Sequence, residues 1–124
     1  MEKILCVDDD QGVLQLYHEE LTDEGYKVIL AKDGKEALSK YAKEKPDLVI
    51  MDIRMPEMNG LKVLTAILGI DRQASIIFNT AYPQYRENFM AWGAEAYVIK
   101  SSDLTELKQK IREILEKRKK LMKS

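Results

Sequence analysis

The chain has 124 residues, enough for one domain with a single buried core that needs neither disulfides nor a structural metal. Its 20 basic and 21 acidic residues nearly cancel to a net charge of -1, which excludes an overall basic field that would favour nucleic acid. The sequence contains no apolar stretch long enough for a signal peptide or a membrane span, and its single cysteine, Cys6, cannot form an intramolecular disulfide. We therefore expect one cytoplasmic domain over residues 1–124, with Cys6 as a buried structural thiol.

Short apolar strands alternate with helical patterns along the chain, which predicts a parallel sheet with helices on both faces. The strands are predicted at Lys3–Val7, Lys27–Ala31, Leu48–Met51, Ala74–Asn79 and Ala94–Ile99. The helices are predicted at about Gln11–Glu24, from Asp33 to Pro46, from Leu61 to near Gly69, at Tyr82–Trp92 and from near Asp103 onward. Asp10 is a predicted N-cap, and Asp33 and Asp103 each precede a glutamate by three residues, the spacing of a capping box.

The centre of the chain combines a short apolar run with an acid and a turn. Leu48–Met51 is too short and too β-branched for a helix, which predicts a strand that is buried on both faces. Asp52 follows at the carboxyl end of this strand, and Pro56 and Gly60 mark a loop. Open α/β sheets place their chemistry at such a position. A strand-ending acid in a solvated turn is the alternative interpretation of this segment on its own.

Charged and hydroxyl side chains follow four of the predicted strands. Asp8 and Asp9 come after the first strand, Asp52 after the third, Thr80 after the fourth and Lys100 after the fifth. Right-handed crossovers put all these strand ends on one edge of the sheet. The set suits phosphoryl transfer to a carboxylate, with Asp52 as the nucleophile and the other two acids helping to hold Mg²⁺, which prefers oxygen ligands. Lys100 and Thr80 would stabilise charge on the transferred group.

Four motifs are specific in combination: Val7–Asp10, Asp52–Gly60, Thr80–Ala81 and Gly93–Lys100. Together they resemble the receiver domain of bacterial two-component response regulators, and the resemblance spans essentially the whole chain. It implies a flavodoxin-like (βα)5 fold, a doubly wound five-stranded parallel sheet in the order 2-1-3-4-5 with helices on both faces. In that order the first and third strands are neighbours, so Asp8 and Asp9 would lie beside Asp52.

The resemblance also implies a function and a set of ligands. A partner histidine kinase carries a phosphohistidine, and the receiver takes its phosphoryl group onto the aspartate that matches Asp52. Among the Mg²⁺ ligands, which include Asp52 itself, Asp9 is the most direct match, Asp8 binds partly through water, and the backbone carbonyl of Arg54 completes the protein's share. The implied partners are a histidine kinase or a phosphotransfer protein, together with a downstream protein or a covalent output domain. A homodimer formed on phosphorylation is a further option.

Thr80 and Tyr97 match the switch pair of the family. In relatives the hydroxyl moves to the phosphoryl group and the aromatic ring turns inward, which remodels the face made by the fourth helix, the fifth strand and the fifth helix. A half-buried strand aromatic without a switching role is the alternative interpretation of Tyr97. No membrane contact, and no direct contact of this domain with nucleic acid, is expected.

The loop after Lys100 departs from the family's pattern. Relatives usually have a proline there, in a cis peptide, whereas this chain has Ser101 and Ser102. Non-proline cis bonds cost about 2.5 to 4 kcal/mol. Either the loop carries that strain, or it takes a trans path that shifts Lys100.

Bulky side chains near the predicted phosphorylation site are the second departure. Arg54 lies two residues past Asp52, and Tyr82 lies two residues past Thr80, where many relatives carry smaller side chains. We hypothesise that Arg54 and Tyr82 screen Asp52 from attacking water and so lengthen the lifetime of the phosphoryl group.

Two other functions remain open on the sequence alone. A small Mg²⁺-dependent phosphatase or phosphotransferase would use the same acids, with Asp10 or Glu57 as general acid, but the chain has too few residues for a cap domain. A receiver-like interaction module that takes no phosphate is the other alternative. A free-standing regulator or phosphorelay intermediate and the excised front end of a longer regulator fit the sequence equally well. The basic run Lys117–Lys120 is predicted to face solvent at a helix C-terminus rather than to bind nucleic acid or a membrane.

Overall fold

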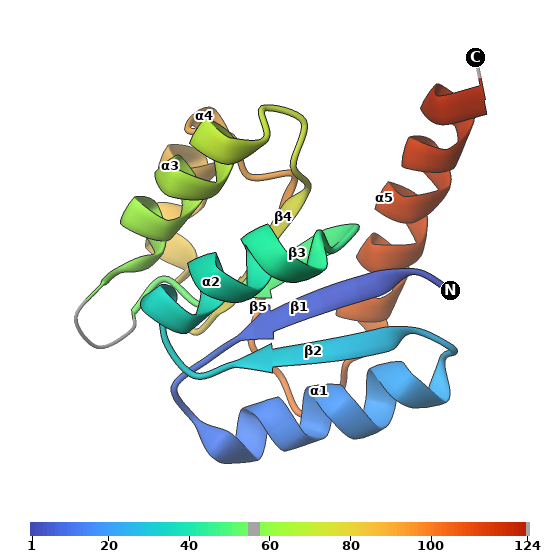
Figure 1. Cartoon of the computed structure of the whole chain (residues 1–124). Coiled ribbons are helices and arrows are strands. Elements are labelled where there is room, and N and C mark those ends of the chain that lie inside the picture. The colour runs from blue at the N-terminus through green and yellow to red at the C-terminus, as the bar shows by residue number, and fades with distance from the viewer. Residues whose placement is uncertain (55–57, 124) are drawn as a thin grey trace.

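Five parallel strands form the centre of the molecule in the order β2-β1-β3-β4-β5 (Figure 1). The computed structural model describes residues 1–54 and 58–123, and for 122 and 123 the backbone alone. The strands are β1 (Lys3–Val7), β2 (Lys27–Ala31), β3 (Leu48–Met51), β4 (Ile76–Thr80) and β5 (Ala96–Ile99). The predicted flavodoxin-like order is confirmed, and β1 and β3 are paired neighbours with Val7 opposite Met51.

The helices cover both faces of this sheet (Figure 1). They are α1 (Gln11–Asp23), α2 (Gly34–Glu44), α3 (Gly60–Ile70), the short 3-10 helix η1 (Pro83–Tyr85), α4 (Arg86–Ala91) and α5 (Thr105–Lys123). Alternate residues of β1 face opposite cores, as the period of a strand requires. Leu5 and Val7 pack with α2, α3 and α4, whereas Ile4 and Cys6 pack with α1 and α5. The expectation of a buried thiol at Cys6 is confirmed, and burial raises its pKa.

Three predicted boundaries are wrong by about two residues, each for a local reason. Ala74 donates its N–H to the carbonyl of Asp71 and Ala94 donates to that of Phe89, so both alanines belong to turns and the strands begin later. The last helix begins at Thr105 instead of near Asp103, whose carboxylate accepts the Thr105 N–H at 2.9 Å. The capping box predicted at Asp103 is therefore not formed at that spacing. The helix predicted at Tyr82–Trp92 is divided into η1 and α4.

The N-termini of α1, α2 and α3 are capped by side chains. Asp10 caps α1 as predicted, since its Oδ1 accepts the N–H groups of Gly12 at 2.8 Å and Val13 at 3.3 Å. Asp33 caps α2, and Asn59 caps α3 by accepting the N–H of Lys62 at 3.1 Å. Within the described part of the chain, no helix is both long enough and apolar enough to cross a membrane.

Gly60 allows the start of α3 to lie directly against the chain that carries Asp52. Its N–H donates to the carbonyl of Ile53 at 2.6 Å. A Cβ atom at this position would lie 2.9 Å from the backbone oxygen of Asp52 and 2.8 Å from the ring of Phe78. Because backbone and a packed ring cannot yield easily, a side chain here would displace the segment that holds Asp52.

We predict that Gly60→Ala lowers the free energy of unfolding by about 1–3 kcal/mol, the usual cost of overpacking. Gly69→Ala on the same helix is the matched control, because a Cβ there would meet no described atom within 4 Å beyond its chain neighbours and its own helix backbone. That control should raise stability by about 0.5–1 kcal/mol, since alanine is the better helix former. Urea denaturation of both variants measures the difference, and equal effects would contradict the close approach at Gly60.

Candidate functional site

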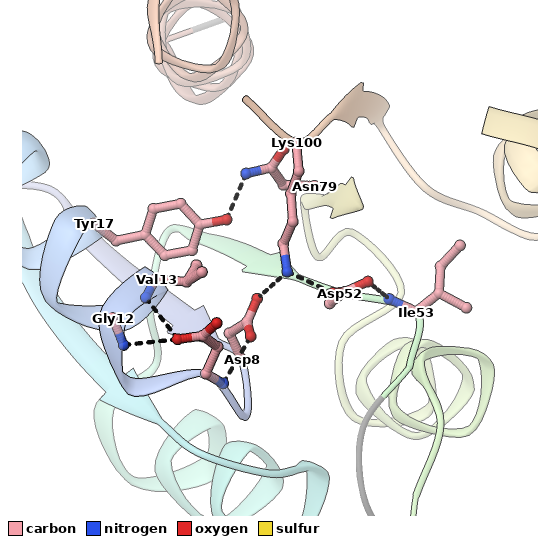
Figure 2. A network of polar contacts seen from close by, with 9 residues as sticks. Asp8, Gly12, Val13, Tyr17, Asp52, Ile53, Asn79 and Lys100 are labelled. Carbon is pink, nitrogen blue, oxygen red and sulfur yellow. Dashed lines mark hydrogen bonds and ion pairs between the residues drawn. The ribbon is translucent and has the colours of Figure 1, made fainter. Parts of the chain in front are cut away.

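Three of the predicted site residues, Asp8, Asp52 and Lys100, lie together at the carboxyl edge of the sheet (Figure 2). Asp8 follows β1 and is 1% exposed, and Asp52 follows β3 and is 7% exposed. The ammonium group of Lys100, which follows β5, lies 2.8 Å from Oδ2 of Asp8 and 2.7 Å from Oδ2 of Asp52. One cation therefore bridges two buried carboxylates that come from neighbouring strands.

Burial and the neighbouring charges of this cluster shift the pKa values of Asp8 and Lys100. Burial raises the pKa of Asp8, against the opposing effect of Lys100. Burial by itself would lower the pKa of Lys100, but hydrogen bonds to Asp52 and Asp8 raise it overall. Lys100 therefore keeps its positive charge at neutral pH. The second oxygens of the two acids accept backbone N–H groups, from Asp10 at 2.9 Å for Asp8 and from Ile53 at 2.6 Å for Asp52.

The peptide bond after Lys100 is trans, since the described residues contain no cis peptide. Of the two paths considered for this loop, the chain takes the one without cis strain. The N–H of Lys100 donates to the carbonyl of Thr80 at 2.8 Å and so extends the pairing of β4 and β5 by one residue. This bond anchors the Lys100 backbone beside β4, and its side chain reaches Asp52 without a proline in the loop.

The remaining candidates for metal binding are less closely gathered. Asp9 is exposed in the turn after Asp8, and Arg54 is exposed beyond Asp52. Glu57, which we considered as a general acid, lies outside the described residues, and Asp10, the other candidate, uses its carboxylate to cap α1. Among the residues that the structure describes, no three acid, histidine or cysteine side chains converge closely enough to hold a metal ion.

The two buried acids nevertheless fit Mg²⁺. This ion commonly binds through one or two carboxylates and completes its shell with water and phosphate oxygens, so three converging side chains are not required. Oδ2 of Asp8 is buried, and within the described part of the protein the ammonium group of Lys100, at 2.8 Å, is its one polar partner. A buried anionic oxygen whose charge is met by a single ammonium group keeps lone pairs for a hard cation.

Thr80 and Tyr97 occupy different depths of the same region. Thr80 ends β4 and is 0% exposed, and its hydroxyl finds no hydrogen-bond partner within residues 1–54 and 58–123. A buried hydroxyl without a partner costs roughly 1–3 kcal/mol, so it is available to a new acceptor. Tyr97 is buried, and its hydroxyl donates to the backbone carbonyl of Tyr82. Tyr97 is therefore more than half-buried, and its switching role stays a prediction.

A buried polar pair beside the site was missed by the sequence analysis. The side-chain amide of Asn79 donates to the hydroxyl of Tyr17 at 2.5 Å and joins β4 to α1 (Figure 2). Both residues line a cavity of about 330 Å³ that also touches Lys100 and Ser101. The one signal in the sequence was an asparagine that directly follows the apolar run Ile76–Phe78.

Residues 4–112 match the family described as the response regulator receiver domain. The chain belongs to this family. It is 34% identical over 116 residues to sporulation initiation phosphotransferase F of Bacillus subtilis, with 92% of this chain and 94% of that protein covered. Several other curated relatives are longer, and the chain spans 45% to 52% of their length.

The fold of this receiver domain is also similar to solved structures. The response regulator TrrA of Thermotoga maritima, in complex with Mg²⁺-BeF, matches with a TM-score of 0.87 and 43% identity, over 92% of this chain and 99% of that one. TrrA in complex with the histidine kinase ThkA matches with a TM-score of 0.85 and the same identity of 43%, over 93% of this chain and 99% of TrrA.

We predict that Lys100→Met lowers the free energy of unfolding by roughly 1–3 kcal/mol at neutral pH, because two buried carboxylates lose their shared cation. Lys108→Met is the matched control, since it removes a lysine that pairs with Glu20 and Glu24 at the surface between α1 and α5. The control should lose less, because solvent screens surface pairs. Urea denaturation measures both, and an equal or larger loss at Lys108 would contradict the bridging role of Lys100.

Proposed function

We propose that the protein accepts a phosphoryl group on Asp52 from the phosphohistidine of a histidine kinase or a phosphotransfer protein. The observation that carries the proposal is the position of Lys100, whose ammonium group lies 2.7 Å from the Asp52 carboxylate and is shared with Asp8. The similarity to a phosphotransferase, and to a response regulator solved with a histidine kinase, supports this choice of donor. The proposal treats residues 1–124 as one cytoplasmic receiver domain that is a phosphoacceptor rather than a turnover enzyme.

In the proposed reaction a carboxylate oxygen of Asp52 forms a bond to phosphorus while the bond from phosphorus to the imidazole nitrogen breaks. The electron pair stays on the imidazole, and the product is an aspartyl phosphate. Lys100 passes from the carboxylate to an oxygen of the bound phosphoryl group, and the unpartnered hydroxyl of Thr80 donates to another. When bound by Asp8, Asp9, Asp52 and the backbone carbonyl of Arg54, Mg²⁺ would neutralise charge on the phosphoryl oxygens.

The proposed output is a change in the face made by α4, β5 and α5. Tyr97 lies beneath this face, and nearby Tyr85, Trp92 and Ile99 are large side chains that are 37%, 47% and 43% exposed. Movement of the Thr80 hydroxyl toward a phosphoryl group would be read there through the position of the Tyr97 ring. A downstream protein, a covalent output domain or a second copy of the chain would bind this face.

The first test is phosphorylation by a small-molecule phosphoryl donor in the presence of Mg²⁺, followed by intact-mass measurement. We expect a single phosphoryl adduct on the wild-type protein, and none on Asp52→Asn or when Mg²⁺ is withheld. Asp52→Asn is a close match in shape, so it isolates the nucleophilic oxygen. Absence of an adduct on folded, Mg²⁺-bound wild-type protein would favour the alternative of an interaction module that takes no phosphate.

A second test addresses the hypothesis that bulky side chains screen Asp52. The guanidinium of Arg54 lies 4.6 Å from the centre of the Tyr82 ring, a cation–π contact. Such a contact contributes about 0.5–1 kcal/mol at an exposed site, so Tyr82→Ala should speed loss of the phosphoryl group roughly two- to five-fold. Tyr85→Ala, which removes the neighbouring ring, is the control and should change the rate less. An unchanged rate in Tyr82→Ala would rule out Tyr82 as a screen.

A further inference from the structure

Tyr82 makes two contacts that face two different parts of the molecule. Its ring lies against the guanidinium of Arg54, two residues beyond the phosphoacceptor. Its backbone carbonyl accepts the hydroxyl of Tyr97, which belongs to β5 and is buried. Tyr82 therefore connects two features: the Arg54–Tyr82 pair, which is proposed to cover Asp52 and is called the cover below, and the proposed switch residue Tyr97.

The backbone conformation of Tyr82 is restricted, so its ring and its carbonyl cannot easily move independently. Pro83 follows, and the residue before a proline is sterically restricted to extended conformations. Tyr82 has φ of -109° and ψ of 96°, an extended conformation. Because the carbonyl cannot turn toward the helical region, we expect a shift of the carbonyl to carry the Tyr82 ring with it.

Tyr97, the buried end of this connection, is linked to the surface through two aromatic contacts. The Tyr97 ring lies 6.3 Å from that of Phe89, and Phe89 packs against the edge of Trp92 with ring centres 5.4 Å apart. Trp92 is 47% exposed and is the single tryptophan of the chain. A change in the position of Tyr97 would therefore reach an exposed aromatic side chain.

We propose that Arg54, Tyr82 and Tyr97 form one interlocked device, in which the buried position of Tyr97 keeps the Arg54–Tyr82 pair closed and so sets the lifetime of the phosphoryl group. This inference rests on the proposed function, because it concerns the stability of a phosphoryl group on Asp52. It deepens that function by making the lifetime depend on the output face. A partner that binds the domain only with Tyr97 buried would hold the cover closed and prolong its own signal.

The test is a double-mutant cycle on the rate of phosphoryl loss, with Arg54→Gln, Tyr97→Phe and the double variant. Tyr97→Phe keeps the ring and removes only the hydroxyl that binds the Tyr82 carbonyl. We expect each single variant to lose the phosphoryl group roughly two- to five-fold faster than wild type, the size of one exposed cation–π contact. The double variant should be no faster than the faster single variant, because both changes open the same cover.

Tyr85→Phe is the matched control, since it removes a tyrosine hydroxyl from the same segment but leaves the bond from Tyr97 to Tyr82 intact. Its rate should equal that of wild type. A wild-type rate in Tyr97→Phe, or a double variant whose acceleration is the product of the two single effects, would overturn the interlock.

Trp92 fluorescence provides a readout that does not require phosphorylation. Arg54→Gln should shift the emission of Trp92 in the same direction as Tyr97→Phe, although the Arg54 contact is with Tyr82 and not with Trp92. A shift in Tyr97→Phe together with a wild-type spectrum in Arg54→Gln would overturn the coupling. Failure of phosphorylation itself would instead count against the proposed function, so the two failures are distinguishable.

Discussion

The rest of the structure depends on one ammonium group placed between two buried carboxylates. Asp8 and Asp52 are 1% and 7% exposed, and neither strand end would tolerate its acid so near the other without Lys100 at 2.8 Å and 2.7 Å. The sheet order supplies this geometry, because β1 and β3 are adjacent and the pairing of β4 with β5 continues through the bond from Lys100 to Thr80. The strand order that defines the fold therefore also places Lys100 between the two acids and balances their charges.

Charges buried in this way are weak evidence for stability, since apolar side chains of similar volume commonly serve a fold as well or better. The site also keeps a buried hydroxyl at Thr80 without a hydrogen-bond partner in the described part of the chain, and a buried oxygen of Asp8 that only Lys100 faces there. The unsatisfied hydroxyl costs free energy in the resting protein, and both groups become useful when an anionic group and a cation enter. Their concentration at one sheet edge is the strongest physical argument that the edge is functional.

The alternation of apolar strands and amphipathic helices was sufficient for a parallel sheet with helices on both faces, and the resemblance to receiver domains supplied the strand order. The acids and Lys100 could be placed at one edge because each follows a strand directly. The sequence was insufficient where apolar residues sit in turns, as at Ala74 and Ala94, whose backbone bonds exclude them from the ladder. The sequence also did not decide between a cis and a trans peptide bond after Lys100, because Ser101 replaces the proline that relatives usually have there. The bond from Asn79 to Tyr17 joins residues 62 positions apart, and no local pattern announces such a contact.

The strength of the contacts also bounds how far the Tyr82 connection can regulate the site. A conformational equilibrium shifts only by the difference in interaction free energy between its two states, and one exposed cation–π contact supplies about 0.5–1 kcal/mol. The cover of Arg54 and Tyr82 can therefore tune a phosphoryl lifetime by a few-fold but not by orders of magnitude. Larger differences in lifetime must arise at Asp52 itself, where Lys100 and Thr80 meet the transferred group within a buried, charged site. The groups around Asp52 thus set the approximate lifetime of the phosphoryl group. Tyr82 changes that lifetime by a few-fold, according to what binds the face made by α4, β5 and α5.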